Sequence, residues 1–345
     1  MHCLRYIFCF CWLSLLGGGI SYGQIVLRLP TQNTAIFTNK PSDFFMYVNR
    51  NFEGQKSTPW EGGTYGFSRT PVRTQSGVIN IKFHEGIDIK PMERATDGSP
   101  VDQIHPVSGG IVVHTSTHPG DSSYGRYVVI EHPTTDGPLY SLYAHLASIS
   151  CKLGDKVGTG NVIGVMGFSG IGINKERSHV HLEIGMLLNK NFQQWYDAKK
   201  ISSPNKHGLF NGFNICGINP VDALTLCKEG TPFSLKSYLA TLKPEYIIRI
   251  PSTGIPDIAK RYPFLLKTGS SPQVSCDIAF ADSGIPLSVT PSAIPCSKPT
   301  VIKATTHPFS QLYRTVNRIN GSSKAPKLTG SGTSYINLLM IGTEP

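Results

Sequence analysis

The stretch His179-Val180-His181-Leu182-Glu183-Ile184 decides how this chain folds, because polar and apolar residues alternate along it. Alternation with a period of two is typical of a β-strand, in which successive side chains point to opposite faces of the sheet. His179, His181 and Glu183 would then share one face, and the three aliphatic residues would share the other. Two imidazoles and a carboxylate on one face need a compensating partner if that face is buried. The pattern therefore favours a metal or catalytic site over a solvated polar face.

Two further histidines lie upstream of this stretch. In His84-Glu85-Gly86-Ile87-Asp88, an imidazole and a carboxylate stand four residues apart. The glycine and the surrounding isoleucines favour an extended or bent segment over a helix. In the run from Tyr140 to Leu146, strand alternation predicts that His145 shares a face with Tyr143, while Leu142, Ala144 and Leu146 point to the core.

These residues form the inventory of a zinc hydrolase. Such a site needs three protein ligands, a fourth position for water, and groups that take and give a proton. Two His and one Asp can supply the ligands, and two further His can do the proton work. The sequence contains no His-Glu-x-x-His, no Gly-x-Ser-x-Gly and no glycine-rich phosphate loop followed by Lys. Glu85 is therefore not expected to act as the base of a zincin.

Four segments follow one another along the chain: residues 83–89 (FHEGIDI), 143–146 (YAHL), 154–164 (GDKVGTGNVIG) and 179–183 (HVHLE). In combination they resemble the lysostaphin-type or LytM-like zinc peptidases of family M23. The resemblance covers residues 83–226. The third segment alone also resembles biotinyl and lipoyl carrier domains, but no Met-Lys-Met-like attachment site accompanies it.

The resemblance implies a role for five residues. His84, Asp88 and His181 would bind one zinc ion per chain, and His145 and His179 would be the catalytic residues beside it. The residues alone leave open which of His179 and His181 binds the metal.

The resemblance also implies an activity, namely hydrolysis of amide bonds in the peptide cross-links of peptidoglycan by an exported zinc endopeptidase. Two alternatives stay open at this point. The first is a metal-free LytM-like module that binds or activates a cell-wall hydrolase. The second is a zinc endopeptidase that acts on proteins. The sequence leaves the oligomeric state and the scissile bond open.

Composition agrees with a β-rich protein. The 345 residues include 35 Gly and 25 Pro, which favour short strands and turns over a helical bundle. We therefore expect an all-β fold, mainly of antiparallel sheet, with few short helices, one of them beginning at Asn219-Pro220. The formal net charge is +10, but no run of five or more Lys or Arg occurs, so nucleic acid is not an expected partner.

The first residues predict export. A short basic start, an apolar run from Tyr6 to Leu16 and small residues near Gly23 indicate a secretory signal over residues 1–23. An uncleaved anchor is the alternative, and stable membrane insertion after cleavage is not expected. The rest of the chain holds five cysteines, and Cys216 with Cys227 and Cys276 with Cys296 are the nearest-neighbour pairings, although unpaired thiols fit equally well.

Three regions should follow the signal. Residues 24–80 form a leader that packs on the core, residues 81–228 the M23-like peptidase domain, and residues 229–345 a β-rich accessory domain. Strands are expected in this last region at residues 246–250, 274–280 and 335–341. The leader could inhibit by donating an oxygen to the metal from Asn49, Asn51 or Glu61, or it could simply complete the core through its large aromatic residues.

The remaining histidines are not expected to take part in chemistry. His114 and His118 lie in an insert and should be exposed to solvent, and His105, His132, His207 and His307 are isolated. The charged segment 171–178 before His179 is longer than the family usually has, which predicts an unusual shape for the substrate groove.

Overall fold

The computed structural model of the chain describes residues 23–343, so the predicted signal at residues 1–23 lies outside the described residues except for Gly23. The strands are β1 (Arg50–Phe52), β2 (Gln55–Ser57), β3 (Gly66–Thr74), β4 (Gly77–His84), β5 (Ile87–Ile89), β6 (Gln103–Ile104), β7 (Gly110–Ser116), β8 (Tyr127–His132), β9 (Leu139–Ala144), β10 (Ser148–Ile149), β11 (Lys156–Val157), β12 (Gly164–Val165), β13 (Val180–Leu187), β14 (Ile215–Ile218), β15 (Tyr246–Pro251), β16 (Ser275–Phe280), β17 (Pro286–Ser292), β18 (Thr300–Ala304), β19 (Ile319–Asn320) and β20 (Lys327–Leu328). The helices are α1 (Pro41–Phe44), α2 (Phe192–Ala198), α3 (Pro220–Leu226), α4 (Leu235–Thr241), α5 (Asp257–Arg261) and α6 (Gly330–Met340), with short 3₁₀ turns η1 (Ala35–Thr38), η2 (Trp60–Gly63), η3 (Gly208–Phe210), η4 (Gly212–Asn214), η5 (Pro263–Leu265) and η6 (Gln311–Arg314). The expected antiparallel β fold with few helices is confirmed.

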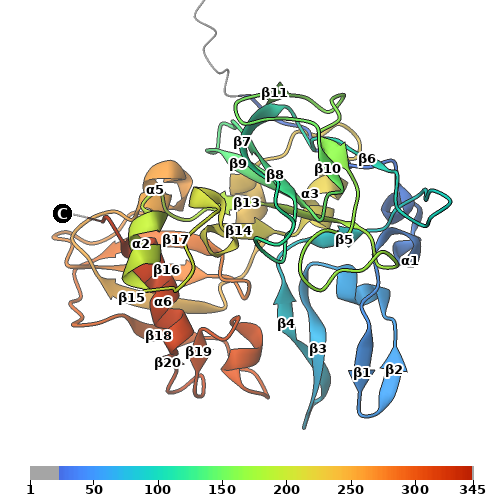
Figure 1. Cartoon of the computed structure of the whole chain (residues 1–345). Helices are drawn as coiled ribbons and strands as arrows, with labels where there is room; N and C mark the ends of the chain where they lie inside the picture. The colour runs from blue at the N-terminus through green and yellow to red at the C-terminus, as the bar shows by residue number, and fades with distance from the viewer. Residues whose placement is uncertain (1–22, 344–345) are drawn as a thin grey trace, which may run out of the picture.

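A seven-stranded antiparallel sheet forms the centre of the molecule, with strand order β11-β7-β8-β9-β13-β14 and β5 paired to β13 (Figure 1). Strand β13 is buried along its whole length. Both its apolar face and its polar face are therefore covered by other parts of the protein. Val180, Leu182 and Ile184 point into the main hydrophobic core. His181 and Glu183 point to the opposite face, where a smaller apolar cluster surrounds Leu142 and Ala144.

The register of β13 fixes the neighbours of His181. This residue pairs with Ala144 of β9 on one side and with Asp88 of β5 on the other. Strand β5 covers the first part of β13, and β14 covers its last part from Ile184 onward. Asp88 therefore stands directly beside His181 although 93 positions of sequence separate them.

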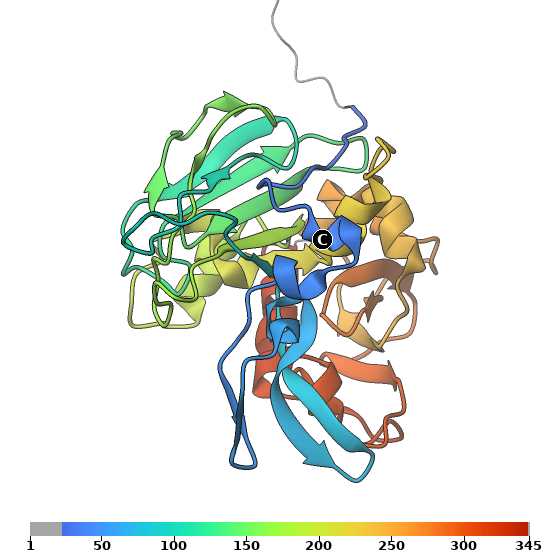
Figure 2. The same ribbon diagram turned by 90° about the vertical axis from the view of Figure 1, so that its right-hand side faces the viewer.

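Two hairpins, β1–β2 and β3–β4, project side by side from the central sheet (Figures 1 and 2). They are joined by a bidentate ion pair of Arg73 with Glu53, with N–O distances of 2.6 and 2.5 Å. Upstream of them, Phe44 and Phe45 are buried in the main core, and Trp60 stacks on the Phe45 ring at 5.8 Å. The aromatic residues of segment 24–80 thus pack in the core, as expected under the alternative in which the leader completes the core. The division of the chain into domains stays a prediction.

The C-terminal region contains a four-stranded sheet of order β17-β16-β15-β18. The strands predicted at residues 246–250 and 274–280 are confirmed as β15 and β16. The strand predicted at residues 335–341 is wrong, because these residues belong to helix α6 and its end. Gly332, Ile336 and Leu339 are buried at helical spacing, and the Thr329 hydroxyl caps the helix by accepting from the Gly332 N–H at 2.9 Å. A short apolar run does not by itself distinguish a strand from a buried helix.

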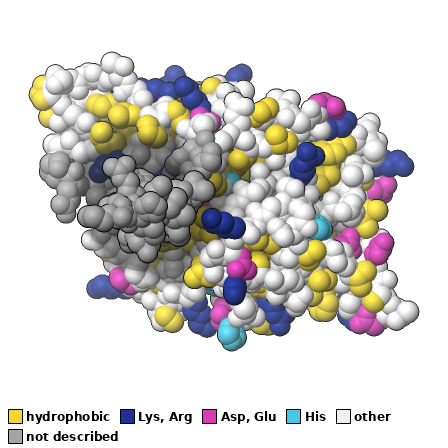
Figure 3. Space-filling view, turned by 90° about the horizontal axis from the view of Figure 1, so that it is seen from above, with side chains coloured by type: hydrophobic (Ala, Val, Ile, Leu, Met, Phe, Trp, Pro, Cys, Tyr) yellow, Lys and Arg dark blue, Asp and Glu magenta, His cyan; other side chains and the backbone are white. Residues whose placement is uncertain are grey.

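The helix predicted at Asn219-Pro220 is confirmed as α3, and the Asn219 side chain accepts a hydrogen bond from the Val221 N–H at 3.1 Å. Helices α2, α4 and α5 were not predicted. The five cysteines within residues 23–343 are free thiols in the structure, so neither suggested pairing is formed. Within residues 23–343, no helix combines the length and apolar character that crossing a membrane requires. On the face shown in Figure 3, basic and acidic side chains are interspersed.

Candidate metal centre

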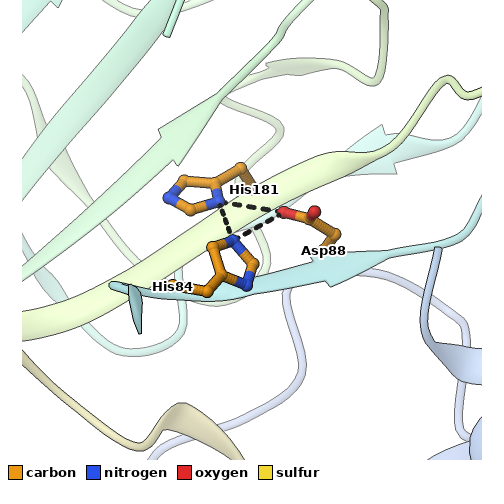
Figure 4. Close-up of side chains that lie close together, drawn as sticks. All are labelled: His84, Asp88 and His181. Atoms are coloured by element: carbon orange, nitrogen blue, oxygen red, sulfur yellow. Dashed lines mark hydrogen bonds and ion pairs between the residues drawn. The ribbon is translucent and has the colours of Figure 1, made fainter. Parts of the chain in front are cut away.

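Two histidines and one aspartate meet where β4, β5 and β13 come together (Figure 4). His84 is the last residue of β4, and Asp88 follows in β5 after a bend, as the glycine between them predicts. His84 Nε2 lies 3.1 Å from His181 Nδ1 and 3.2 Å from Asp88 Oδ1. His181 Nδ1 lies 2.9 Å from the same oxygen. All three side chains are buried.

This triangle of atoms has nearly the size that zinc requires. A tetrahedral ion with bonds of about 2.0–2.1 Å holds its ligand atoms roughly 3.3–3.4 Å apart. Two imidazole nitrogens and one carboxylate oxygen are also a donor set that zinc accepts, with one position left for water or substrate. The donors His84, Asp88 and His181 therefore fit zinc in both chemistry and spacing.

The other ring nitrogen of each ligand histidine is anchored. His84 Nδ1 lies 2.9 Å from the carbonyl oxygen of Thr64, which can only accept, so Nδ1 donates and Nε2 is left to bind the metal. His181 Nε2 lies 3.0 Å from Oε1 of buried Glu183, which leaves Nδ1 for the metal. The Tyr124 hydroxyl donates to the same Glu183 oxygen at 2.6 Å. These contacts fix both rings before any ion binds.

His145 and His179 stand beside the three donors with their rings 4.7 Å apart. His145 Nδ1 donates to the Ser169 carbonyl at 2.9 Å, and His179 Nδ1 donates to the Arg177 carbonyl at 2.7 Å. The Nε2 atom of each ring is thereby left for chemistry, and that of His179 lies 3.4 Å from Asp88 Oδ1. The structure thus brings together all five residues proposed from the sequence.

The prediction that His145 shares a face with Tyr143 is wrong. Strand β9 ends at Ala144, and His145 adopts a left-handed backbone conformation with φ of 64°. Regular alternation therefore stops one residue before the histidine. Tyr143 points into the main core, where its hydroxyl accepts from the Val107 N–H at 2.7 Å, while the turn directs His145 toward the metal ligands.

Residues 82–193 match the family model described as peptidase family M23. This part of the chain is thus similar in sequence to the peptidases of family M23. No curated protein sequence matches the chain.

Solved structures similar to the chain include the catalytic domain of the antimicrobial peptidase lysostaphin from Staphylococcus simulans, at 20% identity and a TM-score of 0.29, covering 48% of this chain and 96% of that one. CbpA from L. salivarius REN is 20% identical with a TM-score of 0.30, covering 50% of this chain and 89% of that one. The catalytic domain of the prophage-encoded M23 protein EnpA from Enterococcus faecalis is 26% identical with a TM-score of 0.25, covering 36% and 87%.

Positive and negative charges are balanced around the three candidate metal donors. Burial alone would favour a neutral Asp88, but the imidazoles of His84 and His179 hold its pKa well below the usual range. Burial likewise opposes charge on His181, yet hydrogen bonds with Asp88 and Glu183 raise its pKa to about 9. Burial, with help from the neighbouring imidazoles, holds the pKa of His145 well below its usual value. His145 is therefore neutral near pH 7 and able to accept a proton.

One basic residue that sequence reasoning missed reaches the three candidate metal donors. Arg69 of β3 places Nη2 2.6 Å from Asp88 Oδ2 and 3.0 Å from His84 Nε2. Its Nε donates to the Gly62 carbonyl at 2.8 Å, which holds the guanidinium in place. The leader thus delivers a cation to the metal centre, where the inhibitory alternative expected an oxygen ligand. Asn49 and Asn51 line a separate pocket on the β1–β2 hairpin.

An open groove of about 850 Å³ surrounds the three candidate metal donors together with His145 and His179. The long segment 171–178 contributes Ile171 and Arg177 to its wall, in agreement with the expectation that this segment shapes the groove. Tyr124 and the segment around His207, a residue that was expected to be isolated, also line the groove.

The expectation that His114 and His118 are both exposed to solvent is half right. His118 is exposed, but His114 lies on β7 with its ring 5.0 Å from that of Tyr127. Burial lowers the pKa of His114 to about 4.

Proposed function

We propose that this chain is an exported zinc endopeptidase that hydrolyses amide bonds in the peptide cross-links of peptidoglycan. The observation that carries the proposal is the convergence of three metal donors with two anchored imidazoles in one open groove. The family assignment of residues 82–193 supports the reaction type and the cell-wall substrate. Export is proposed from the first 23 residues of the sequence.

The role proposed for each of the five residues follows from the side-chain nitrogen or oxygen atom that it leaves free. His84 Nε2, Asp88 Oδ1 and His181 Nδ1 would hold zinc, which when bound polarises the scissile carbonyl and makes water more acidic. His145 Nε2 is placed to accept a proton from the attacking water and return it to the leaving amine. His179 Nε2 is placed to form a hydrogen bond with the oxygen on which negative charge develops.

Two observations bear on the alternative functions. A metal-free module would not need three donors at zinc-like spacing with both ligand imidazoles anchored from behind. A protease acting on proteins would use the same groups, so the distinction between wall and protein substrates rests on the family assignment.

One experiment separates these possibilities. The purified mature protein would be analysed for zinc and incubated with cross-linked muropeptides and, in parallel, with a panel of proteins. We expect one zinc per chain and muropeptide products whose masses correspond to hydrolysis of one amide bond. A zinc-loaded protein that cuts proteins but no muropeptide would overturn the substrate, and a protein without zinc and without cleavage would overturn the enzyme.

A further inference from the structure

A second cavity of about 440 Å³ lies between the peptidase sheet and the C-terminal region, and we call it the Arg318 cavity. Its walls include Ile215 of β14 from the first region and Arg318 and Tyr335 from the last. It shares Phe83, Glu85, Gly212 and Phe213 with the groove around the metal ligands, so the two hollows are neighbours. Phe213 is 62% exposed at this shared boundary. A chain bound in the groove can therefore reach the second cavity.

Arg318 is a cation without an acidic partner. Its guanidinium donates from Nη1 to the Ser283 carbonyl at 2.9 Å and has the hydroxyl of buried Tyr246 beside it, but no carboxylate oxygen of residues 23–343 lies within 4.0 Å. The side chain is half-buried. Arginine has five N–H donors and is seldom withdrawn from water unless paired, so most of its bonding capacity remains for a ligand.

The position of this guanidinium is built into the fold. It lies 3.7 Å from the ring centroid of Tyr335, whose hydroxyl donates to the Gly284 carbonyl at 2.8 Å. A Cβ atom at residue 284 would collide with Nη1, so the glycine makes room for the charge. Stacking on an aromatic ring leaves the edge of a guanidinium free for bidentate binding of a carboxylate.

The rest of the Arg318 cavity suits an anion attached to an apolar chain. Lys199 adds a second positive charge, and Ser331 and Ser334 present hydroxyls from the first turns of the eleven-residue helix α6. Trp195 and Leu338 supply apolar walls. The one acidic residue of the lining, Glu85, stands on the boundary shared with the groove.

We propose that the Arg318 cavity is a substrate subsite that binds a carboxylate of the peptide whose scissile bond lies in the neighbouring groove. This inference rests on the proposed peptidase function and adds to it a preference for peptides with a free carboxylate. It also gives the C-terminal region a part in substrate selection.

The test compares two synthetic cross-linked stem peptides that differ only in one group, a free carboxylate or a carboxamide. Both kcat/KM and equilibrium binding would be measured, the latter on the zinc-loaded full-length His145→Ala variant. We expect wild type to prefer the carboxylate peptide about tenfold or more in each measurement, because Arg318 and the carboxylate would form a hydrogen-bonded charge pair that the carboxamide cannot form.

Two variants address the subsite itself. Arg318→Gln should abolish the preference. Ser331→Glu should do the same through charge repulsion, and an acid in the first turn of α6 is compatible with the helix dipole, so folding is preserved. Thr333→Glu is the matched control, because Thr333 is exposed on the same helix and does not line the cavity. It should keep the preference.

The outcomes distinguish the two proposals. Equal cleavage and equal binding of both peptides by wild type would overturn the subsite and leave the peptidase function standing. Tighter binding of the carboxylate peptide, lost in Ser331→Glu but without cleavage of either peptide, would support the subsite and overturn the peptidase function. A preference that persists in both Arg318→Gln and Ser331→Glu would also overturn the subsite.

Discussion

Of the four imidazoles at the candidate metal centre, three leave Nε2 free and one leaves Nδ1 free, and a hydrogen bond to the opposite nitrogen decides which. Backbone carbonyls anchor Nδ1 of His84, His145 and His179, while the Glu183 carboxylate anchors Nε2 of His181. The two ligand rings therefore bind through different atoms. If His179 were the metal ligand and His181 were not, the hydrogen bonds that anchor both rings would have to change. The geometry therefore distinguishes two histidines that the sequence alone leaves equivalent.

Removing any one of the three metal donors should remove the zinc. His84→Ala, Asp88→Ala and His181→Ala each leave two ligands, too few to hold the ion against water. Elemental analysis of the purified variants checks this expectation. Full zinc occupancy in two of them would show that the ligands are assigned wrongly.

The catalytic histidines should behave differently from the ligands. His145→Ala and His179→Ala should keep zinc and lose turnover by about 10²–10⁴-fold, the range of general acid–base catalysis. Zinc content and the rate of muropeptide cleavage would be measured on the same samples. Near-wild-type rates in either variant would remove that residue from the mechanism.

Glu183 is a positioning residue for His181, because its carboxylate holds the ring nitrogen that faces away from the other two metal donors. Glu183→Ala should weaken zinc binding by about 10–100-fold, as loss of an outer carboxylate does in other zinc sites. Glu183→Gln retains a hydrogen-bond acceptor and should recover much of the affinity. Competition with a chelator measures both variants, and an unchanged affinity in Glu183→Ala would contradict the role.

At the scale of elements, the β3–β4 hairpin contributes to the metal centre from both strands. Strand β4 ends in His84, and β3 carries Arg69 to the free oxygen of Asp88. One of the two alternatives for the leader was an oxygen ligand at the metal, and the β3–β4 hairpin instead places a positive charge there. Such a charge pairs with Asp88 and opposes a dication at the same ligands.

Removing this charge should therefore tighten zinc binding. Arg69→Met is expected to raise the zinc affinity about tenfold, because a like charge next to the ion is lost. Arg73→Met is the control, since Arg73 lies on the same strand but pairs with Glu53 away from the ligands. Chelator competition on both variants gives the comparison. Weaker zinc binding in Arg69→Met would show that the guanidinium mainly orients the carboxylate.

At the scale of the whole molecule, buried histidines outside the groove link stability to pH. His132 of β8 is fully buried, with Nδ1 2.8 Å from the Gly109 carbonyl and Nε2 2.7 Å from the Ser141 hydroxyl. Burial lowers its pKa to about 4 from an ordinary value of 6.5. Between these two values the unfolded chain takes up a proton that the folded chain does not, so acidification favours unfolding.

The free energy of unfolding should therefore decrease as the pH falls from about 6.5 to about 4. The part due to His132 is on the order of 3 kcal/mol, given 1.36 kcal/mol for each unit of pKa. Denaturant titrations of wild type and His132→Gln at several pH values would check it. The variant should lose less stability over this window, and identical pH profiles would contradict the assignment.

Local patterns predicted much of the sheet and drew attention to the five central residues, because alternation along β13 and the short His-Asp spacing depend only on neighbouring positions. The separate roles of the five residues came from the family resemblance. The errors have a different origin. Arg69 reaches Asp88 through a hairpin register, and His145 turns off its strand at a single unusual backbone angle. Helix α6 was misread because its apolar run is short, and the Arg318 cavity depends on contacts between distant parts of the chain. No pattern within a few residues encodes such contacts.

The register of β13 also limits how the length of this sequence can change during evolution. One inserted residue within Val180–Leu187 would exchange the two faces, turning His181 toward the core and an aliphatic side chain toward the ligands. Segment 171–178 lies just before the strand and is exposed at Ile171, Gly172 and Asn174, so insertions and deletions there leave the pairing intact. Homologues should therefore vary in length before Ser178 and hold it constant after His179, changing the substrates they accept while keeping the same metal ligands.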